Sequence, residues 1–409
     1  MVIDNLFWIG LLLVVGYVAG IVSERFRLPK VTGYILIGIV LSPSVTHILP
    51  ESFLCETETI VHFALSMIAF MIGGSLKYEK IKKLEKTILS MMLSESETAF
   101  ALVALGLFFC LPFIALDYLA SESWKEYLLM ALFLGAISAA TAPAAVLAVM
   151  HEYRAKGPLT TTLLGIVATD DAIALINFSL VLSVAALIQG GDGNNHFLTL
   201  LEPLFTIFFS LVFGITAGWL QARHINTITK EGSLIISTIG VLLIIYASAE
   251  HFALDGLLVC MAYGVILVNK TKKSDEVFQV IQEHFEEIIF VFFFILSGAS
   301  VELKVLAEVW PIALLYVLLR IIGKMLGSWF GARISNAEPM IKKYTGMALM
   351  PQAGVAIGLA LMLYHNPDFS KIGPLVLNTV IAATAINEIV GPFLLKIALF
   401  KAGEAKEPK

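Results

Sequence analysis

The chain alternates long apolar segments with short polar loops over its 409 residues. An α-helix needs about 20 mostly apolar residues to cross a bilayer, and these segments approach or exceed that length. Charged residues make up only 14% of the chain, against about 25% in a soluble domain. We therefore predict an all-α polytopic membrane protein. Its thirteen transmembrane helices are expected near 5–23, 31–46, 58–76, 87–116, 127–150, 158–189, 197–221, 232–250, 254–269, 285–301, 309–333, 344–364 and 374–399.

The basic residues are sorted between alternate loops. Of 27 lysines and arginines, most fall in the loops of one side. The other side holds Lys125, Lys304 and Lys371, and two further residues, Arg320 and Lys324, fall inside a segment. Because cytoplasmic loops carry the excess of basic residues, this pattern predicts an N-terminus outside and a C-terminus in the cytoplasm.

The two halves of the chain resemble each other. The third segment ends in a Gly-Gly-Ser stretch at 73–75, and the tenth ends in Gly-Ala-Ser at 298–300. The fifth is interrupted at Pro143 and the twelfth at Pro351. Members of each pair stand seven helices apart, so the halves have opposite orientations and form inverted repeats. Matched interruptions of this kind mark the binding site of a transporter, although two incidental proline kinks are the alternative.

Two adjacent aspartates, Asp170 and Asp171, stand inside the sixth segment. Asp170 lies about 18 Å along its helix, near the middle of the bilayer. A charge at that depth costs at least a few kcal/mol, and two like charges cost more. We therefore expect the pair to hold a cation, a proton, or each in turn. The two side chains point about 100° apart on a helix, so their roles should differ.

Arg320 and Lys324 are the basic residues of the eleventh segment. They are four positions apart and share one helix face. Arginine stays charged and suits a structural pair, whereas a buried lysine can lose its proton. We expect Lys324 to pair with Asp170 and to take part in proton coupling, and Asp171 to be the main cation ligand. The alternative makes both basic residues ion-pair struts with no role in transport.

Three further acids fall within apolar segments. Glu95 and Glu97 belong to the fourth segment, whose repeat counterpart is the eleventh. One of them could pair with Arg320, or both could line a cytoplasmic vestibule. Glu388, in the thirteenth segment, is expected to compensate the end of a half-helix. All three are interpreted as structural charges.

Five motifs carry a family resemblance. In chain order they occupy residues 28–43, 139–143, 169–172, 320–324 and 351–354. Together they resemble the monovalent cation/proton antiporter superfamily over nearly the whole chain. The Asp-Asp pair with a lysine resembles the electrogenic sodium/proton branch, since electroneutral relatives typically carry Asn-Asp.

The resemblance implies a fold and a site. The fold would be that of a sodium/proton antiporter, with two crossed, interrupted helices in a six-helix core domain and with elevator-like alternating access in a homodimer. The breaks would lie at Pro143, Pro351, Gln352 and Gly354. Some relatives carry an acid where this chain has Ala142, so ligands from this stretch would be the Thr141 hydroxyl or backbone carbonyls.

The corresponding division of the chain has five parts. Dimerisation-domain helices 1–3 occupy residues 1–86, and core-domain helices 4–6 occupy 87–189. Linker helix 7 and dimerisation helices 8–10 follow at 190–308, core helices 11–13 at 309–400, and a short cytoplasmic tail at 401–409. We expect this protein in the bacterial plasma (inner) membrane, in contact with lipid.

The function predicted from these features is secondary antiport of sodium, or lithium, against protons. Cation and proton would compete at Asp170 and Asp171, and two protons per sodium would follow if both Asp170 and Lys324 release theirs. No enzyme activity, cofactor, nucleotide or nucleic acid is expected. The nearest alternative is a potassium/proton or electroneutral antiporter.

Three other classes fit the sequence less well. An organic-anion/sodium symporter would need polar groups for its solute. An intramembrane aspartyl protease needs two aspartates that face each other from different helices, and adjacent aspartates diverge. A non-transporting sensor or a channel-like protein is the third alternative.

Overall fold

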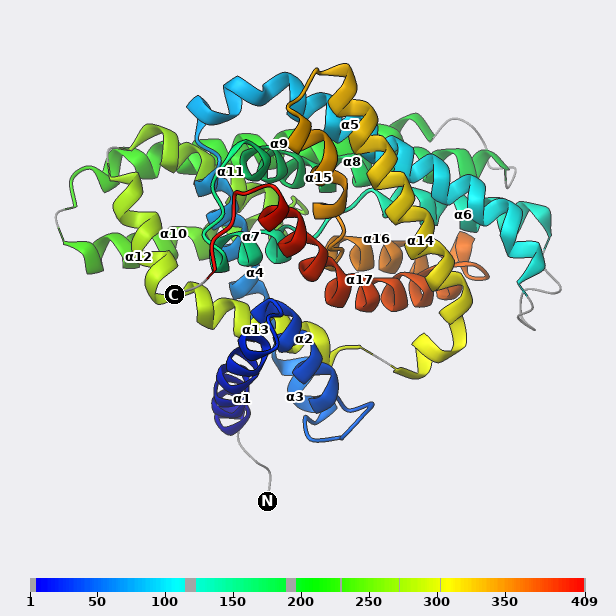
Figure 1. Cartoon of the computed structure of the whole chain (residues 1–409), viewed down its shortest axis with the longest axis horizontal. Helices are drawn as coiled ribbons and strands as arrows, with labels where there is room; N and C mark the ends of the chain where they lie inside the picture. Colours follow the sequence, from blue (N-terminus) through cyan, green and yellow to red (C-terminus); the bar gives the residue numbers. More distant parts are fainter. Residues whose placement is uncertain are drawn as a thin grey trace. The chain divides into compact units, whose positions relative to one another are not determined.

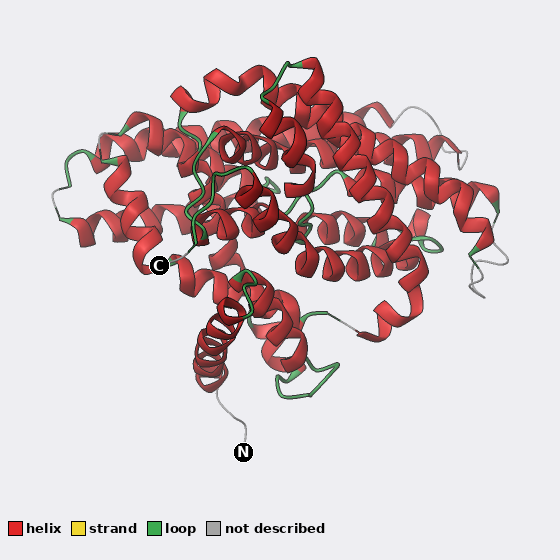
Figure 2. Cartoon of the chain, in the orientation of Figure 1, coloured by secondary structure: helices red, strands yellow, loops and turns green. Residues whose placement is uncertain are grey.

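The computed structural model describes residues 5–114, 123–188, 196–228, 230–271, 273–301 and 303–407 (Figure 1). Within these ranges all regular structure is helical, and loops join the helices (Figure 2). Nine helical stretches of the described chain are long and apolar enough to span a membrane. Shorter apolar helices cover Lys30–Leu41, Gly256–Lys270 and Gly354–Tyr364. The predicted all-helical, multi-pass class is confirmed, while the count of thirteen stays a prediction.

The chain forms two compact units. Unit 1 comprises 1–83, 147–152 and 205–300, and unit 2 comprises 84–146, 153–204 and 301–409. The helices of unit 1 are α1 (Asn5–Arg25), α2 (Lys30–Leu41), α3 (Glu51–Glu56), α4 (Glu58–Ser75), α10 (Glu231–His251), α11 (Gly256–Lys270), α12 (Ser274–His284) and α13 (Glu286–Ala299), with most of α9 (His196–Ile225).

Unit 2 contains every helix that carries the predicted site. These helices are α5 (Tyr78–Cys110), α6 (Trp124–Ser138), α8 (Pro158–Ile188), α14 (Leu303–Ile334), α15 (Pro339–Ala348), α16 (Gly354–Tyr364) and α17 (Gly373–Lys401), with the 3₁₀ turns η1 (Leu111–Phe113) and η2 (Pro367–Phe369). Helix α7 (Pro143–Glu152) begins in unit 2 and ends in unit 1.

Glycines bring the helices of unit 1 together in two similar pairs. A Cβ on Gly73 of α4 would lie 2.1 Å from the Met261 carbonyl oxygen of α11. A Cβ on Gly298 of α13 would lie 2.3 Å from the Ile35 carbonyl oxygen of α2. Small residues allow such close approach of helix backbones. The two similar glycine-containing segment ends found in the sequence therefore have the same role, since each lets its helix pack closely against a neighbouring helix.

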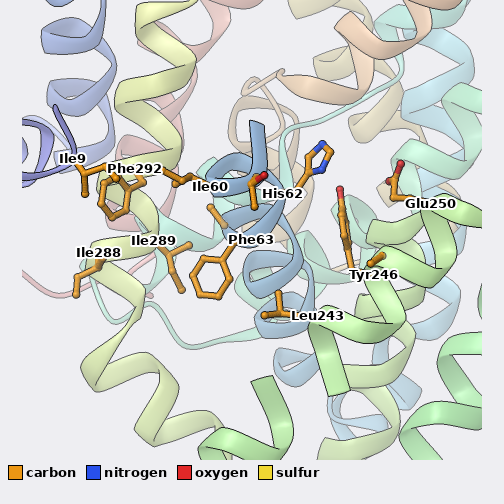
Figure 3. Close-up of a pocket in the computed structure, with 13 residues that line it drawn as sticks. Ile9, Ile60, His62, Phe63, Leu243, Tyr246, Glu250, Ile288, Ile289 and Phe292 are labelled. Carbon is orange, nitrogen blue, oxygen red and sulfur yellow. The ribbon is translucent and has the colours of Figure 1, made fainter. Parts of the chain in front are cut away.

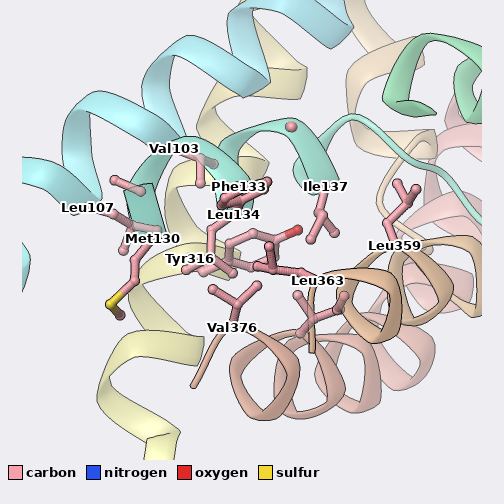
Figure 4. Packing of buried hydrophobic residues seen from close by; sticks show 14 of the residues in the cluster. Val103, Leu107, Met130, Phe133, Leu134, Ile137, Tyr316, Leu359, Leu363 and Val376 are labelled. Carbon is pink, nitrogen blue, oxygen red and sulfur yellow. The ribbon is translucent and has the colours of Figure 1, made fainter. Parts of the chain in front are cut away.

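A large apolar core fills unit 2 beside the helix breaks. Phe133 of α6, Tyr316 of α14, Leu359 of α16 and Val376 of α17 are buried together in it (Figure 4). Close packing of this kind leaves side chains few alternative rotamers. The core therefore fixes the helix ends that frame the breaks.

Helix boundaries differ from expectation where polar residues continue a helix. Helix α5 begins at Tyr78 rather than near 87, because the lysine-rich stretch after Lys77 has good helix formers and can wind onto the apolar segment. The twelfth segment consists of two helices, α15 and α16, as its predicted interruption at Pro351 requires.

Candidate ion-binding site

The two interrupted helices contact each other at their breaks. Residues 139–142 separate α6 from α7, and residues 349–353 separate α15 from α16. The Ala142 backbone N–H donates to the Pro351 carbonyl oxygen at 2.9 Å. A proline cannot donate such a bond, so each Pro marks a point where the helix ladder is open. The predicted interruptions at Pro143, Pro351 and Gln352 therefore lie at or beside the breaks, and Gly354 begins α16.

Arg320 ties the two breaks together. Its guanidinium is fully buried and donates to three carbonyl oxygens: Ser138 at 3.0 Å, Ala140 at 2.7 Å and Met350 at 2.8 Å. These carbonyls belong to helix ends, which carry partial negative charge. Arg320 is therefore balanced by backbone dipoles, and no ion pair with Glu95 or Glu97 is formed.

Gln352 adds a second, uncharged link. Its amide nitrogen donates to the Ile137 carbonyl oxygen at 3.1 Å and to the Tyr316 hydroxyl at 2.9 Å. Its amide oxygen accepts a bond of 3.0 Å from Asn387 of α17. Glu388, the next residue, is buried at 2% exposure. Helix α17 thus brings polar groups to the break in α15–α16.

Lys324 lies one turn along α14 from Arg320. Its ammonium nitrogen is 2.7 Å from the Ala139 carbonyl oxygen and 2.8 Å from the Thr141 hydroxyl oxygen. It lies 2.8 Å from a Glu95 carboxylate oxygen and 3.4 Å from Asp170 Oδ2. The expected Lys324–Asp170 contact is present but long, and Glu95 is the closer carboxylate.

Asp170 is fully buried. The Thr141 hydroxyl donates a short hydrogen bond to its Oδ2, while its Oδ1 accepts none from the described residues. A buried carboxylate oxygen without a donor is costly unless a proton or a cation reaches it. Asp171 is half-buried, so the two aspartates have different surroundings, as their angular separation predicts.

Glu95 and Glu97 have different environments although they are two residues apart. Glu95 is fully buried, and Ser96 Oγ donates to its Oε1 at 3.0 Å. Its Oε2 accepts no aligned hydrogen bond in the described chain, so the contact with Lys324 is an ion pair. Glu97 is exposed and accepts a bond of 3.1 Å from Asn177.

A glycine stripe on α14 places Glu95 beside Lys324. A Cβ on Gly323 would lie 2.6 Å from Ala99 Cα, and one on Gly327 would lie 2.6 Å from Glu95 Cα. Gly331 continues the stripe against Met91. Glycines at this four-residue spacing let α14 and α5 touch along their backbones. The sequence signal for the Glu95 contact is this four-residue spacing of Gly323, Gly327 and Gly331.

The first turn of α8 is completed from far along the chain. The backbone N–H groups of Leu159 and Thr160 donate to the Glu404 carboxylate at 2.8 and 2.7 Å, and the Thr160 hydroxyl donates at 2.7 Å. A carboxylate at a helix N-terminus satisfies open N–H groups and favours the helix dipole. The residues after α17 therefore anchor the helix that carries Asp170 and Asp171.

Unit 1 contains a separate cavity of about 770 Å³. Figure 3 shows its apolar lining, including Phe63 and Phe292, and the polar side chains of His62, Tyr246 and Glu250. The residues that line it do not include Asp170, Thr141, Lys324 or Glu95. The breaks and their buried charges, all within unit 2, remain the candidate site.

Comparison with known proteins identifies the family. The transmembrane sodium/hydrogen exchanger family model matches residues 10–401. A Na(+)/H(+) antiporter of Enterococcus hirae is 24% identical over 398 residues, which cover 94% of this chain and 96% of the relative. The Na(+)/H(+)-K(+) antiporter GerN of Bacillus cereus is 25% identical over 360 residues, covering 87% and 86%.

The fold has a solved counterpart. The sodium proton antiporter MjNhaP1 of Methanocaldococcus jannaschii superposes with a TM-score of 0.71 at 19% identity, covering 98% of this chain and 96% of that one. These relatives are membrane transporters, and the resemblance read from the five motifs is confirmed at the level of the superfamily. The chain belongs to the transmembrane sodium/hydrogen exchanger family, within the monovalent cation/proton antiporter superfamily.

Proposed function

We propose that this protein exchanges sodium, or lithium, for protons by competition at Asp170 and Asp171. One observation supports this most: Asp170 is fully buried between the two helix breaks, and its Oδ1 has no hydrogen-bond donor within the described chain. A buried carboxylate in this state has a strong demand for positive charge. A proton or a small cation meets that demand equally, so the two exclude each other.

The neighbouring groups give each ion a defined environment. Thr141 and the carbonyl oxygens of the break between α6 and α7 are hard oxygen donors, which suit a small monovalent cation as substrate. Asp171, half-buried on the next position of α8, is proposed as the main cation ligand. Lys324 couples the cycle because it can approach or leave Asp170 as the cation binds.

The transport cycle needs no ATP. Protons occupy the aspartates on the acidic side, sodium displaces them on the alkaline side, and alternating access exposes the site to each side in turn. All of these residues belong to unit 2, which fits a core domain that carries the site in an elevator-like movement. Electrogenic exchange requires more than one proton per sodium, and two aspartates in one site can supply them.

We also propose a homodimer formed through unit 1, in the bacterial inner membrane and in contact with lipid. The exposed apolar face of α1, which includes Leu6, Val14 and Val18, is available to lipid or to a second copy. Light scattering of the purified protein at known detergent content would give twice the mass of one chain. A single-chain mass would contradict the proposal.

The alternative function is potassium/proton or electroneutral exchange. It is favoured by the name of one relative, the Na(+)/H(+)-K(+) antiporter GerN. The acid pair with a buried lysine favours the sodium scheme, because the electroneutral relatives in the family that this chain resembles typically carry Asn-Asp at this pair.

Proteoliposomes with an imposed pH gradient and a fluorescent proton reporter test the proposal. Sodium or lithium should dissipate the pH gradient, and an imposed membrane potential should change the rate of that dissipation.

Asp171→Asn and Asp170→Asn should each abolish the signal from the proton reporter. Glu97→Gln, which changes an exposed residue of α5, should keep it. Retained exchange in Asp171→Asn would refute the ligand assignment. A response to potassium alone, or none to potential, would establish the alternative, and no response to any cation would refute antiport.

A further inference from the structure

Glu95 is a buried charge of unit 2 that the exchange scheme above does not use. It is fully buried, it stands on α5, and it faces the same ammonium group as Asp170. Its contact with Lys324 is 2.8 Å, against 3.4 Å for Asp170. The lysine therefore has two carboxylates within reach and lies closer to the one that no transport role explains.

The hydroxyl of Thr141 separates Lys324 from Asp170. Lys324 donates to Thr141 Oγ1 at 2.8 Å, and Thr141 Oγ1 donates in turn to Asp170 Oδ2. An ammonium has three N–H donors, and the hydrogen bonds of Lys324 go to Ala139, to Thr141 and, at 3.4 Å, to Asp170. Glu95 is the closer carboxylate, at 2.8 Å, but its contact is an ion pair without an aligned hydrogen bond. Asp170 is the most distant of these four oxygens, and Thr141 connects it to the lysine in addition to their long direct contact.

The sum of the buried charges likewise assigns Lys324 to Glu95 and leaves Asp170 for the transported ion. Glu95, Asp170 and Lys324 are all fully buried, and with all three ionised these three groups sum to one negative charge. The neighbouring charge of Arg320 is not counted here because three backbone carbonyl oxygens already accept its hydrogen bonds. A low-dielectric site does not tolerate that charge alone. If Glu95 neutralises Lys324, the remaining negative charge rests on Asp170, where a proton or a sodium ion can cancel it.

We propose that Glu95 is a positioning residue that holds the charge of Lys324, so that Asp170 is left for the transported cation or proton. This inference rests on the proposed exchange function. When the cation binds Asp170, Lys324 shifts fully to Glu95 and keeps its proton. The protons that move are then those of the two aspartates, and Lys324 contributes none.

Removing the Glu95 charge should transfer the lysine to Asp170. In Glu95→Gln the ammonium becomes a tethered competitor of sodium, and the sodium KM should rise by about tenfold or more. The maximal rate at saturating sodium should change by less than about threefold, because the exchanging groups are intact. The double variant Glu95→Gln/Lys324→Met removes both charges and should bring the KM back toward the wild-type value. Glu97→Gln, two positions away and exposed, is the matched control and should leave the KM unchanged.

A merely structural role for Glu95 would give a different result. The maximal rate and the thermal stability would fall together, the KM would stay constant, and the double variant would be worse than the single one. Either a constant KM or a failure of the double variant to restore it would overturn the proposal.

A double-mutant cycle on thermal unfolding tests the pairing without any transport. Coupling between Glu95→Gln and Lys324→Met should exceed coupling between Asp170→Asn and Lys324→Met, since the first pair is closer. The reverse order would overturn the inference. If wild-type protein moved no protons with any cation, the exchange function would fail, while this cycle would still decide which carboxylate holds the lysine.

Discussion

Thr141 connects the two charged groups of the site, Lys324 and Asp170. Its hydroxyl accepts from Lys324 and donates to Asp170, and it is 1% exposed. A hydroxyl can do both at once, whereas a methyl group of the same size can do neither. The position was predicted as a cation ligand, and its contacts add a second role, the relay between lysine and aspartate.

Thr141→Val should therefore impair cation binding. It removes the hydrogen bond from the hydroxyl to Asp170 and the one that the hydroxyl accepts from Lys324, at a cost of about 1–3 kcal/mol, which corresponds to about 5- to 150-fold in affinity. Thr141→Ser keeps the hydroxyl and should stay within about threefold of the wild-type sodium KM. The measurement is the sodium KM in proteoliposomes. Equal values for the valine and serine variants would show that the hydroxyl has no part in binding.

The sequence revealed the residue types of the site but not their partners. The Asp-Asp pair and the lysine four residues from an arginine are each visible in one apolar segment, and the two matched prolines are visible when the fifth and twelfth segments are compared. Glu95 was noted as a structural charge, yet its contact with Lys324 depends on the rotation of α5 against α14. Rotation about a helix axis is set by packing in three dimensions, and one segment read alone does not contain it.

At the scale of helices, the contact between α5 and α14 determines where Glu95 stands. The glycines of α14 touch backbone atoms of α5, and a backbone atom cannot rotate away from an added Cβ. By contrast, a Cβ on Gly358 of α16 would meet no atom within 4 Å. Substitution by alanine should therefore change the stability of the protein in opposite directions at a glycine of the α14 stripe and at Gly358.

Gly327→Ala should destabilise the protein, because its Cβ would lie 2.6 Å from Glu95 Cα. Overpacking of this kind costs about 1–3 kcal/mol. Gly358→Ala should be neutral or stabilising, since alanine is favoured over glycine inside a helix by about 0.5–1 kcal/mol. Thermal unfolding in detergent measures both, and a lower Tm for Gly358→Ala than for Gly327→Ala would contradict the packing argument.

The interrupted helices were foreseen from Pro143 and Pro351, and the structure places a hydrogen bond between the two breaks. Proline acts locally, so its effect can be predicted from sequence. The start of α5 at Tyr78 could not be read from hydropathy, because that stretch is polar and is held in the helix by continuation of the hydrogen-bond ladder rather than by burial.

At the scale of the whole molecule, helix contacts repeat between the halves. Helix α4 packs on α11 through Gly73, and α13 packs on α2 through Gly298. In the predicted inverted repeat these are the third segment on the ninth and the tenth on the second, which is one contact made twice. The pattern supports the prediction of inverted repeats, which the sequence analysis drew from the matched glycine-containing ends and proline interruptions.

The sorting of basic residues predicts which side each loop occupies. In a variant without the three native cysteines, Lys371→Cys should react with a membrane-impermeant maleimide from outside. Its side chain is 76% exposed, so access is not limiting. Lys401→Cys, also exposed, should react only after the membrane is opened. Labelling of the two positions from the same side would contradict the predicted topology.

The Glu404 contact has a consequence for the order in which the protein is made. Thr160 and Glu404 are 244 positions apart, so α8 emerges from the ribosome and enters the membrane long before its capping carboxylate exists. During that interval the first N–H groups of α8 must be held by water or lipid headgroups. Synthesis therefore completes the helix of Asp170 and Asp171 only after residue 404 has been made, and the ion site reaches its final form only when α17 has been inserted.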